Sequence, residues 1–193
     1  MSKRVTIDGV ETLSHRWANL RLYKIHYTRT DGLTQALERE VHDHGHGACV
    51  LPYDATRGTI LLVKQFRLPM FLSGESGELI EVCAGLLDGD PPETCVQREA
   101  IEELGYRIDN LRQVASTFMT PGGVTERITM FLADYRAEWK VGSGGGHAAE
   151  GEDIEVLEMP FAEAWAMLQG GQLADAKTVV SLMFLERELS SRS

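Results

Sequence analysis

The sequence has few cysteines, and their spacing matches no disulfide or metal motif. The chain contains three, Cys49, Cys83 and Cys95, an odd number without CxxC spacing. A disulfide framework needs cysteines in pairs, and a zinc knuckle needs closely spaced ligands, so neither is expected. The 43% hydrophobic content instead indicates a chain that folds around an ordinary apolar core.

Long apolar runs and clusters of positive charge are also missing. No apolar stretch approaches the roughly 20 residues that a membrane-spanning helix needs, and residues 1–11, MSKRVTIDGVE, hold no apolar signal segment. The 19 Lys and Arg residues are scattered, and 29 Asp and Glu residues bring the net charge to −10. We therefore expect a cytoplasmic protein whose main partners are neither nucleic acids nor membranes.

Chain length and the order of the expected elements indicate an α/β protein. A length of 193 residues suits one domain, or one domain with an appendage. Strands, a helix, more strands and two helices follow one another, which suggests an α/β sandwich with a mixed sheet. We expect an N-terminal antiparallel β segment at residues 1–45 and the main domain at 46–193.

Residue alternation predicts most of the strands. Residues 20–27 alternate between apolar and polar side chains, and Asp31-Gly32 suits a hairpin turn that leads to a second strand at 34–41. A lone hairpin is only marginally stable, so we expect it to pack on a partner subunit or on the main domain. Further strands are expected at 47–53, 59–66, 78–83, 111–119, 125–135 and 154–159, and helices at 161–169 and 178–190.

The segment before Gly105 carries the signals of an amphipathic helix. Asp90 can act as its N-cap with Pro91 at the first helical position, and Gly105 suits the left-handed residue that ends it. Its buried side is expected to comprise Ile101 and Leu104 with Val96 or Ala100.

Three carboxylates share one face of this helix. Glu99, Glu102 and Glu103 stand at positions i, i+3 and i+4, where like charges destabilise a helix by roughly 0.2–0.5 kcal/mol per pair. A bound cation removes that repulsion, and oxygen ligands in this number suit Mg²⁺, with Mn²⁺ as a substitute. The alternative is an acidic face that water solvates.

Two other segments admit both a functional and a plain interpretation. Residues 142–153 are dominated by glycine and are expected to lack regular structure, forming either a linker or a mobile loop that carries Glu150, Glu152 and Asp153. His42, His44 and His46 alternate as metal ligands on a strand would, but the residues between them favour exposed loop histidines.

The helix and its flanks resemble the signature of the Nudix hydrolase family. That signature is a glycine, five residues, a glutamate, seven residues, and then REUxEExGU, in which U is aliphatic. The matching residues are Gly85, Arg98, Glu99, Glu102, Glu103 and Gly105. Asp90 stands where the family usually has glutamate, one residue early, and Tyr106 fills an aliphatic position. The resemblance extends to LLVKQFR, SGELIEVCAGLLD, TPGGVTE and DAKTV, and is strongest to the branch that hydrolyses GDP-mannose.

The resemblance implies a Nudix α/β/α sandwich, a homodimer with exchanged N-terminal sheets, and Mg²⁺ as cofactor. It assigns the metal ligands to the Ala84 carbonyl, Glu99, Glu103 and Glu152, with Glu102 completing the cluster through water. Arg98 is expected to orient a helix carboxylate by a bidentate pair. Glu152 is the first candidate for the catalytic base and Glu150 the second. The implied substrate-binding residues are Trp17, Arg39, Glu40, Arg67, Glu126 and Lys177.

The activity that this resemblance implies is hydrolysis of a nucleotide sugar at its diphosphate. GDP-mannose is the expected substrate, with GMP and mannose 1-phosphate as products. One alternative within the same fold is an ADP-ribose pyrophosphatase, because only the base and sugar contacts would differ. The alternative from another class is a catalytically silent domain that binds a sugar nucleotide, although such a binder has little need for so many repelling carboxylates.

Overall fold

The computed structural model describes residues 4–191, which form two compact units. Unit 1 consists of the chain up to His46 together with Phe118–Arg127. Unit 2 consists of Gly47–Thr117 and the chain from Ile128 onward. Unit 1 thus includes a loop that lies more than seventy residues further along the sequence than the N-terminal segment. In residues 4–191 no helix has both the length and the apolar character needed to cross a membrane.

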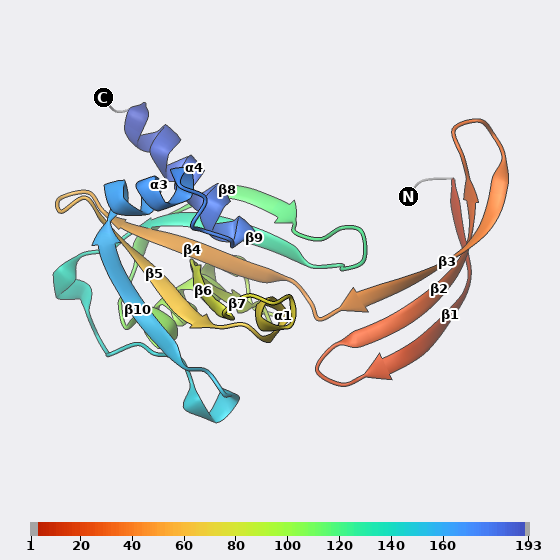
Figure 1. Ribbon diagram of the computed structural model, residues 1–193, viewed down its shortest axis with the longest axis horizontal. Coiled ribbons are helices and arrows are strands. Elements are labelled where there is room, and N and C mark those ends of the chain that lie inside the picture. Colours follow the sequence, from red (N-terminus) through yellow and green to blue (C-terminus); the bar gives the residue numbers. More distant parts are fainter. Residues whose placement is uncertain (1–3, 192–193) are drawn as a thin grey trace. The chain divides into compact units, whose positions relative to one another are not determined.

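Unit 1 is built on a three-stranded antiparallel sheet in the order β1-β2-β3 (Figure 1). The strands are β1 (Val5–His15), β2 (Asn19–Thr28) and β3 (Thr34–Asp43). The predicted hairpin turn is confirmed, since Gly32 has a φ of 86° and the Arg29 amide donates to the Leu33 carbonyl at 2.8 Å. Opposite faces of this sheet receive alternate side chains, as the sequence pattern indicated.

The loop at residues 118–127 is hydrogen-bonded to the end of β3 within unit 1. The His42 amide donates to the Gly123 carbonyl at 2.8 Å, and the Thr125 amide donates to the His42 carbonyl at 3.0 Å. The Thr125 hydroxyl also donates to Asp43 at 2.7 Å. These bonds extend the strand pairing by one isolated bridge and fix the end of β3.

Unit 2 contains a seven-stranded mixed sheet. Its main order is β10-β5-β4-β9-β8, with β6 paired to β5 and β7 paired to β4. The β4–β9 pair is parallel, whereas the β10–β5, β4–β5, β4–β7 and β5–β6 pairs are antiparallel. The strands are β4 (Gly47–Asp54), β5 (Thr59–Phe66), β6 (Glu78–Glu81), β7 (Cys83–Leu86), β8 (Asp109–Phe118), β9 (Arg127–Asp134) and β10 (Ile154–Pro160). The strand expected at 78–83 is therefore interrupted at Val82.

Helices cover both faces of the unit 2 sheet, which gives the expected α/β/α sandwich. The helix α2 contacts β7 and β4, whereas α4 contacts β4 and β6 and α3 contacts β10 (Figure 1). The helical elements are α1 (Leu68–Leu72), α2 (Pro92–Glu99), the π-helical turn η1 (Ala100–Leu104), the 3₁₀ turns η2 (Ala137–Trp139) and η3 (Ala148–Glu150), α3 (Phe161–Gln169) and α4 (Ala176–Ser190). The sequence did not reveal α1, which is too short to show a period.

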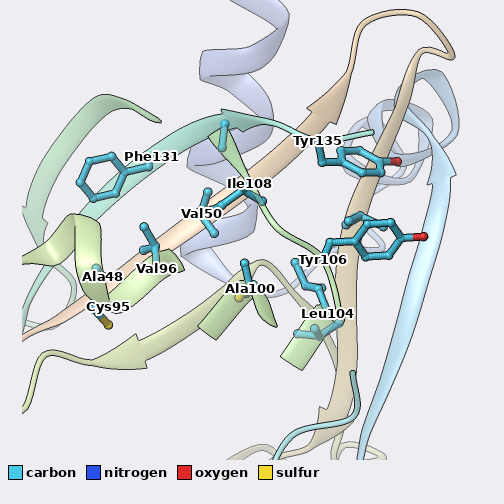
Figure 2. Packing of buried hydrophobic residues seen from close by; sticks show 14 of the residues in the cluster. Ala48, Val50, Cys95, Val96, Ala100, Leu104, Tyr106, Ile108, Phe131 and Tyr135 are labelled. Carbon is cyan, nitrogen blue, oxygen red and sulfur yellow. The ribbon is translucent and has the colours of Figure 1, made fainter. Parts of the chain in front are cut away.

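A buried apolar cluster lies between the sheet and α2–η1 (Figure 2). Val96, Ala100 and Leu104, four residues apart, are fully buried against strand residues such as Val50. Burial of such side chains contributes roughly 1.5–3 kcal/mol each for the larger ones. Because Glu99 and Glu103 directly precede two of these buried positions, the core fixes where both carboxylates stand.

Two details of this helix differ from the sequence prediction. Its N-cap is Pro91 rather than Asp90, and no side chain caps it; the Asp90 amide instead donates to the Leu87 carbonyl at 2.8 Å in the preceding turn. Ile101, expected to be buried, is 45% exposed. The predicted end is confirmed, because Gly105 adopts the left-handed conformation with a φ of 78°.

Candidate functional site

The acidic helix ends in a π-helical turn rather than in regular α-helix. In η1 the chain is wound more widely, and the Tyr106 amide reaches back to the Ala100 carbonyl at 3.1 Å. Such turns are rare and occur often at functional sites. Within this turn the carboxylates of Glu102 and Glu103 have different surroundings, since Glu103 is buried and the Glu102 side chain is 26% exposed.

Glu103 is the buried carboxylate of the set. Its side chain is 3% exposed, and its Oε2 accepts a hydrogen bond from the Ala84 amide at 3.2 Å. The pKa of Glu103 is raised to about 8, chiefly by burial and also by the neighbouring charges of Glu99 and Glu152, which together outweigh the hydrogen bonds that lower it. Three carboxylates thus converge closely enough to repel one another, which is the electrostatic environment that a divalent cation relieves.

Glu99 and Glu102 are instead paired with Arg98. The Arg98 Nη1 lies 2.9 Å from Glu99 Oε1 and 3.4 Å from Glu102 Oε2. The same nitrogen lies near both carboxylates, so Arg98 is shared between two acids, and a bidentate pair with one of them stays a prediction. Arg98 also donates from Nη2 to the Leu86 carbonyl at 3.4 Å, which ties the helix to the strand β7. Arg98 therefore fixes the spacing of two acids at once.

Gly85 allows Glu99 to lie against β7. A Cβ atom at this position would come within 2.0 Å of Glu99 Oε1, so a side chain there would displace the carboxylate. Gly85 is followed in β7 by Leu86, and its neighbour Ala84 pairs with Cys49 of β4. The glycine is required by a close approach of strand and carboxylate, which explains its place in the motif.

The glycine-rich segment caps the end of the acidic helix. The Gly145 amide donates to the Glu103 carbonyl at 2.9 Å, and the Gly146 amide donates to the Glu102 carbonyl at 3.1 Å. These carbonyls belong to the last turn, which has no partners of its own within the helix. The segment is therefore anchored, and its only regular structure is the single turn η3, close to the expected absence of any.

The anchored segment brings Glu152 into the group of acids. Its Oε2 accepts a hydrogen bond from the His147 amide at 2.8 Å, and its charge contributes to the raised pKa of Glu103. The His147 ring, which sequence reasoning missed, lies 3.4 Å from Glu102 Oε1. The side chain of Glu150, the second candidate base, lies outside the described residues, so its position stays a prediction.

The donor set fits a hard divalent cation in kind. All the candidate ligands are oxygens, and the charges of two of them, Glu99 and Glu152, act on the third carboxylate, Glu103. Among the described residues, however, no three Asp, Glu, His or Cys side chains are already close enough to hold a metal together. In their present positions Glu99 contacts Arg98, Glu103 contacts the Ala84 amide and Glu152 contacts the His147 amide.

Replacing Gly144 with alanine is expected to unfold this anchor. Gly144 has a φ of 70°, and a Cβ atom there would come within 2.4 Å of the Glu103 carbonyl oxygen, which belongs to the backbone and cannot turn away. We expect a loss of at least about 2 kcal/mol in the free energy of unfolding, measured by urea denaturation.

Gly151 provides the matched control for this measurement. It has a φ of 79° in the same segment, but a Cβ atom there meets nothing within 4 Å. Gly151→Ala should therefore cost only the backbone strain, about 1 kcal/mol. Equal losses for the two variants would show that the loop does not pack on the helix end.

A second cluster of charges in unit 2 contains two of the expected substrate-binding residues. Arg67 and Lys177 both contact the carboxylate of Glu81, which is 2% exposed. Lys177 also donates to Asp175 at 2.6 Å, and Asp175 caps α4 by accepting from the Thr178 amide at 2.8 Å. Glu81 and Asp175 were not identified from the sequence, in which they look like ordinary strand and loop acids.

The other expected substrate-binding residues, Trp17, Arg39, Glu40 and Glu126, belong to unit 1. Trp17 is 74% exposed, and its indole stacks on the His44 ring at a centroid distance of 5.0 Å. The Nε2 of His44 lies 3.8 Å from Glu126 Oε1. Within unit 1 the structure thus links Trp17 to Glu126 through His44.

The histidine loop is less exposed than the sequence suggested. His42 lies at the end of β3 and is partly buried, and the side chain of His44 is only 13% exposed. Both rings pack near Trp17, at centroid distances of 6.2 and 5.0 Å. Only His46 has the exposed loop position that was expected.

Comparisons with known proteins give matches over almost the whole chain. A family model for the NUDIX domain matches residues 43–181, and one for the GDP-mannose pyrophosphatase NudK N-terminal domain matches residues 4–42. Curated proteins named GDP-mannose pyrophosphatase from Escherichia coli O1:K1 / APEC and Shigella boydii serotype 4 (strain Sb227) are each 44% identical over 187 residues, with 96% of this chain and 97% of theirs covered. A crystal structure of an ADP compounds hydrolase superposes with a TM-score of 0.76 at 17% identity, covering 99% of this chain and 97% of that one, which supports the fold.

Proposed function

The chain belongs to the Nudix hydrolase family, and from this premise we propose that it hydrolyses the diphosphate bond of a nucleotide sugar. GDP-mannose is the proposed substrate, and GMP and mannose 1-phosphate are the products. The observation that carries this proposal is the 44% identity to curated GDP-mannose pyrophosphatases over 96% of the chain. The charges of Glu99 and Glu152 that act on the buried carboxylate of Glu103 support the chemistry.

Nudix hydrolases generally need a divalent metal, and we propose Mg²⁺ for this chain, with Mn²⁺ able to replace it. The proposed ligands are the carbonyl of Ala84 and the carboxylates of Glu99, Glu103 and Glu152, with Glu102 contributing through water. Because all these donors are oxygens, the set favours Mg²⁺ or Mn²⁺ over softer metals.

Separate side chains of the protein are proposed to transfer the proton and to hold the carboxylates in place. A bound divalent ion would neutralise the phosphoryl oxygens and make a bound water more acidic. Glu152 accepts the proton of the attacking water, with Glu150 as the second candidate for this role. Arg98 holds Glu99 and Glu102 at a fixed spacing, so that neither carboxylate has to reorganise during the reaction.

Substrate contacts are assigned to both units. In unit 2, Arg67 and Lys177 are cations that would face the phosphates or the sugar. In unit 1, Trp17 exposes an indole on which a guanine base would stack, and Arg39, Glu40 and Glu126 are the remaining proposed contacts.

We also propose that the protein is a homodimer that pairs through its N-terminal sheets and works in the cytoplasm. The strand β1 exposes Val5, Ile7, Val10 and Leu13, each more than 40% accessible, on a sheet of only three strands. Several exposed apolar side chains on one strand support an association surface. The molar mass in solution, measured by light scattering, tests the dimer.

The proposed activity is tested by a substrate panel in the presence of Mg²⁺. GDP-mannose, ADP-ribose and other nucleoside diphosphate sugars are compared by kcat/KM, with products identified by chromatography. We expect GDP-mannose to give GMP and to be preferred, and EDTA to abolish turnover. Preference for ADP-ribose would make the protein an ADP-ribose pyrophosphatase. Tight nucleotide binding without any product would indicate a silent binding domain instead.

A further inference from the structure

A buried carboxylate outside the acidic helix joins the two cations that are proposed to bind substrate in unit 2. Glu81 is the last residue of β6 and is 2% exposed. Its Oε1 accepts from Arg67 Nε at 2.6 Å, and its Oε2 accepts from Arg67 Nη2 at 3.3 Å and from Lys177 Nζ at 3.2 Å. One carboxylate therefore sets the position of both cationic groups relative to each other.

The arrangement around Glu81 is held rigidly from three sides. The Val82 amide donates to the Thr178 hydroxyl at 2.8 Å, and that hydroxyl donates to Asp175 at 2.7 Å. Asp175 in turn accepts from Lys177 Nζ at 2.6 Å. The strand end, the cap of α4 and the lysine thus belong to one continuous hydrogen-bond network, with few alternative positions for the lysine.

Charge balance in this network keeps the cations available to a ligand. Burial lowers the pKa of Lys177, but Asp175 and Glu81 outweigh burial and raise it above the ordinary value, so the ammonium stays protonated. Arg67 remains 42% exposed while Glu81 occupies its Nε and Nη2, so its remaining hydrogens can face a ligand. The buried Glu81 carboxylate orients the guanidinium of Arg67, and the exposed part of that guanidinium can bind an anion.

We infer that Glu81 is a positioning residue for the substrate, acting through Arg67 and Lys177 rather than by touching the substrate itself. This inference rests on the proposed function, in which those two side chains bind the nucleotide sugar. Glu81 would fix the distance and direction between the two cations before the substrate arrives, which reduces the ordering cost of binding. We expect the effect in substrate affinity, because the two groups that Glu81 contacts, Arg67 and Lys177, are proposed to bind the substrate rather than to activate the attacking water.

The test is the isosteric variant Glu81→Gln, with Glu78→Gln as control. Glu78 lies in the same strand and is exposed. Among the described residues its carboxylate forms an ion pair only with Lys64, at 3.6 Å. We expect Glu81→Gln to raise KM for GDP-mannose about tenfold with kcat within about threefold of the wild type. Glu78→Gln should change neither. An unchanged KM, or a loss confined to kcat, would overturn the inference.

A variant cycle separates positioning from general damage to the fold. In the Arg67→Gln/Lys177→Met background, adding Glu81→Gln should raise KM no further, because the groups that it positions are gone. A further increase in that background would contradict the inference. If Glu81→Gln alone does not fold, Glu81→Asp takes its place: it keeps the charge beside the buried cations but withdraws the carboxylate by one methylene, so KM should again rise, and an unchanged KM would overturn the inference.

The proposed function and this inference fail in distinguishable ways. Wild-type protein that does not turn over GDP-mannose refutes the proposed function, whatever the variants do. In that case the same comparison is made with inorganic pyrophosphate as the probe, by calorimetric titration. Weaker pyrophosphate binding by Glu81→Gln, with the difference abolished in the double-variant background, would support the positioning role, and unchanged binding would refute it.

Discussion

Glu103→Gln is expected to reduce kcat for GDP-mannose by at least about 100-fold while the protein stays folded. The glutamine keeps the shape of the buried side chain but cannot carry the charge that would hold a divalent ion. Glu103 is also the acid on which the charges of Glu99 and Glu152 converge, so its loss removes the centre of the proposed metal site. Steady-state kinetics across a range of Mg²⁺ concentrations measures the effect.

Glu93→Gln is the matched control for this variant. Glu93 lies in the first turn of the same helix and is exposed. The Glu93→Gln variant should retain the wild-type kcat, because it removes one acidic charge from the helix without changing the buried acids. Near-normal turnover by Glu103→Gln would show that Glu103 does not hold the metal, and far-ultraviolet circular dichroism of both variants would confirm that the helix is intact.

The metal-free protein is expected to lose stability as the pH rises from about 4.5 to about 8. Burial raises the pKa of Glu103 from 4.5 to about 8, so the folded protein holds a proton that the unfolded chain releases earlier. Ionising the unfolded chain over this interval favours unfolding, so the contribution of the protonated carboxyl is complete below pH 4.5 and is lost as the pH approaches 8. The expected loss is roughly 2–5 kcal/mol.

Urea denaturation in EDTA at several pH values measures this loss. The variant Glu103→Gln should lack it and should be more stable than the wild type near pH 8, because its side chain does not ionise. Saturating Mg²⁺ should restore the wild-type stability at that pH, since a ligand that binds only the folded state stabilises it. If the free energy of unfolding of the wild type and that of Glu103→Gln change with pH in the same way, Glu103 is not buried and protonated in the folded protein.

The local features of the acidic helix were predictable from sequence, because they depend on spacing alone. Gly105 ends the helix as expected, and Val96 and Leu104 are buried as their period indicated. The differences among the three acids were not predictable. They depend on the π-helical turn, on the strand β7 that covers Glu103, and on an arginine that pairs with Glu99 and Glu102 together.

The failures have a common physical cause, which is that partners far along the chain override local preference. Asp90 is an exception to this cause: it is a good cap by composition, but the helix begins one residue later, with Pro91 at the cap position and no side chain capping it. Glu81 looks like an ordinary strand acid until the fold brings Arg67 and Lys177 to it. In residues 142–146 the glycines looked flexible, but the helix end gives their amides fixed acceptors.

The glycine-rich segment fixes both ends of the loop that carries Glu152 at a single residue, Gly145. Gly145 donates to the Glu103 carbonyl and accepts from the Ile154 amide at 3.3 Å, so residues 146–153 leave and return at one point. Closing a ring costs only about 0.6 kcal/mol more for each doubling of its length. The loop at residues 146–153 can therefore be longer or shorter in related enzymes with little effect on folding stability. A change in its length would place the loop carboxylates at a different distance from the acidic helix.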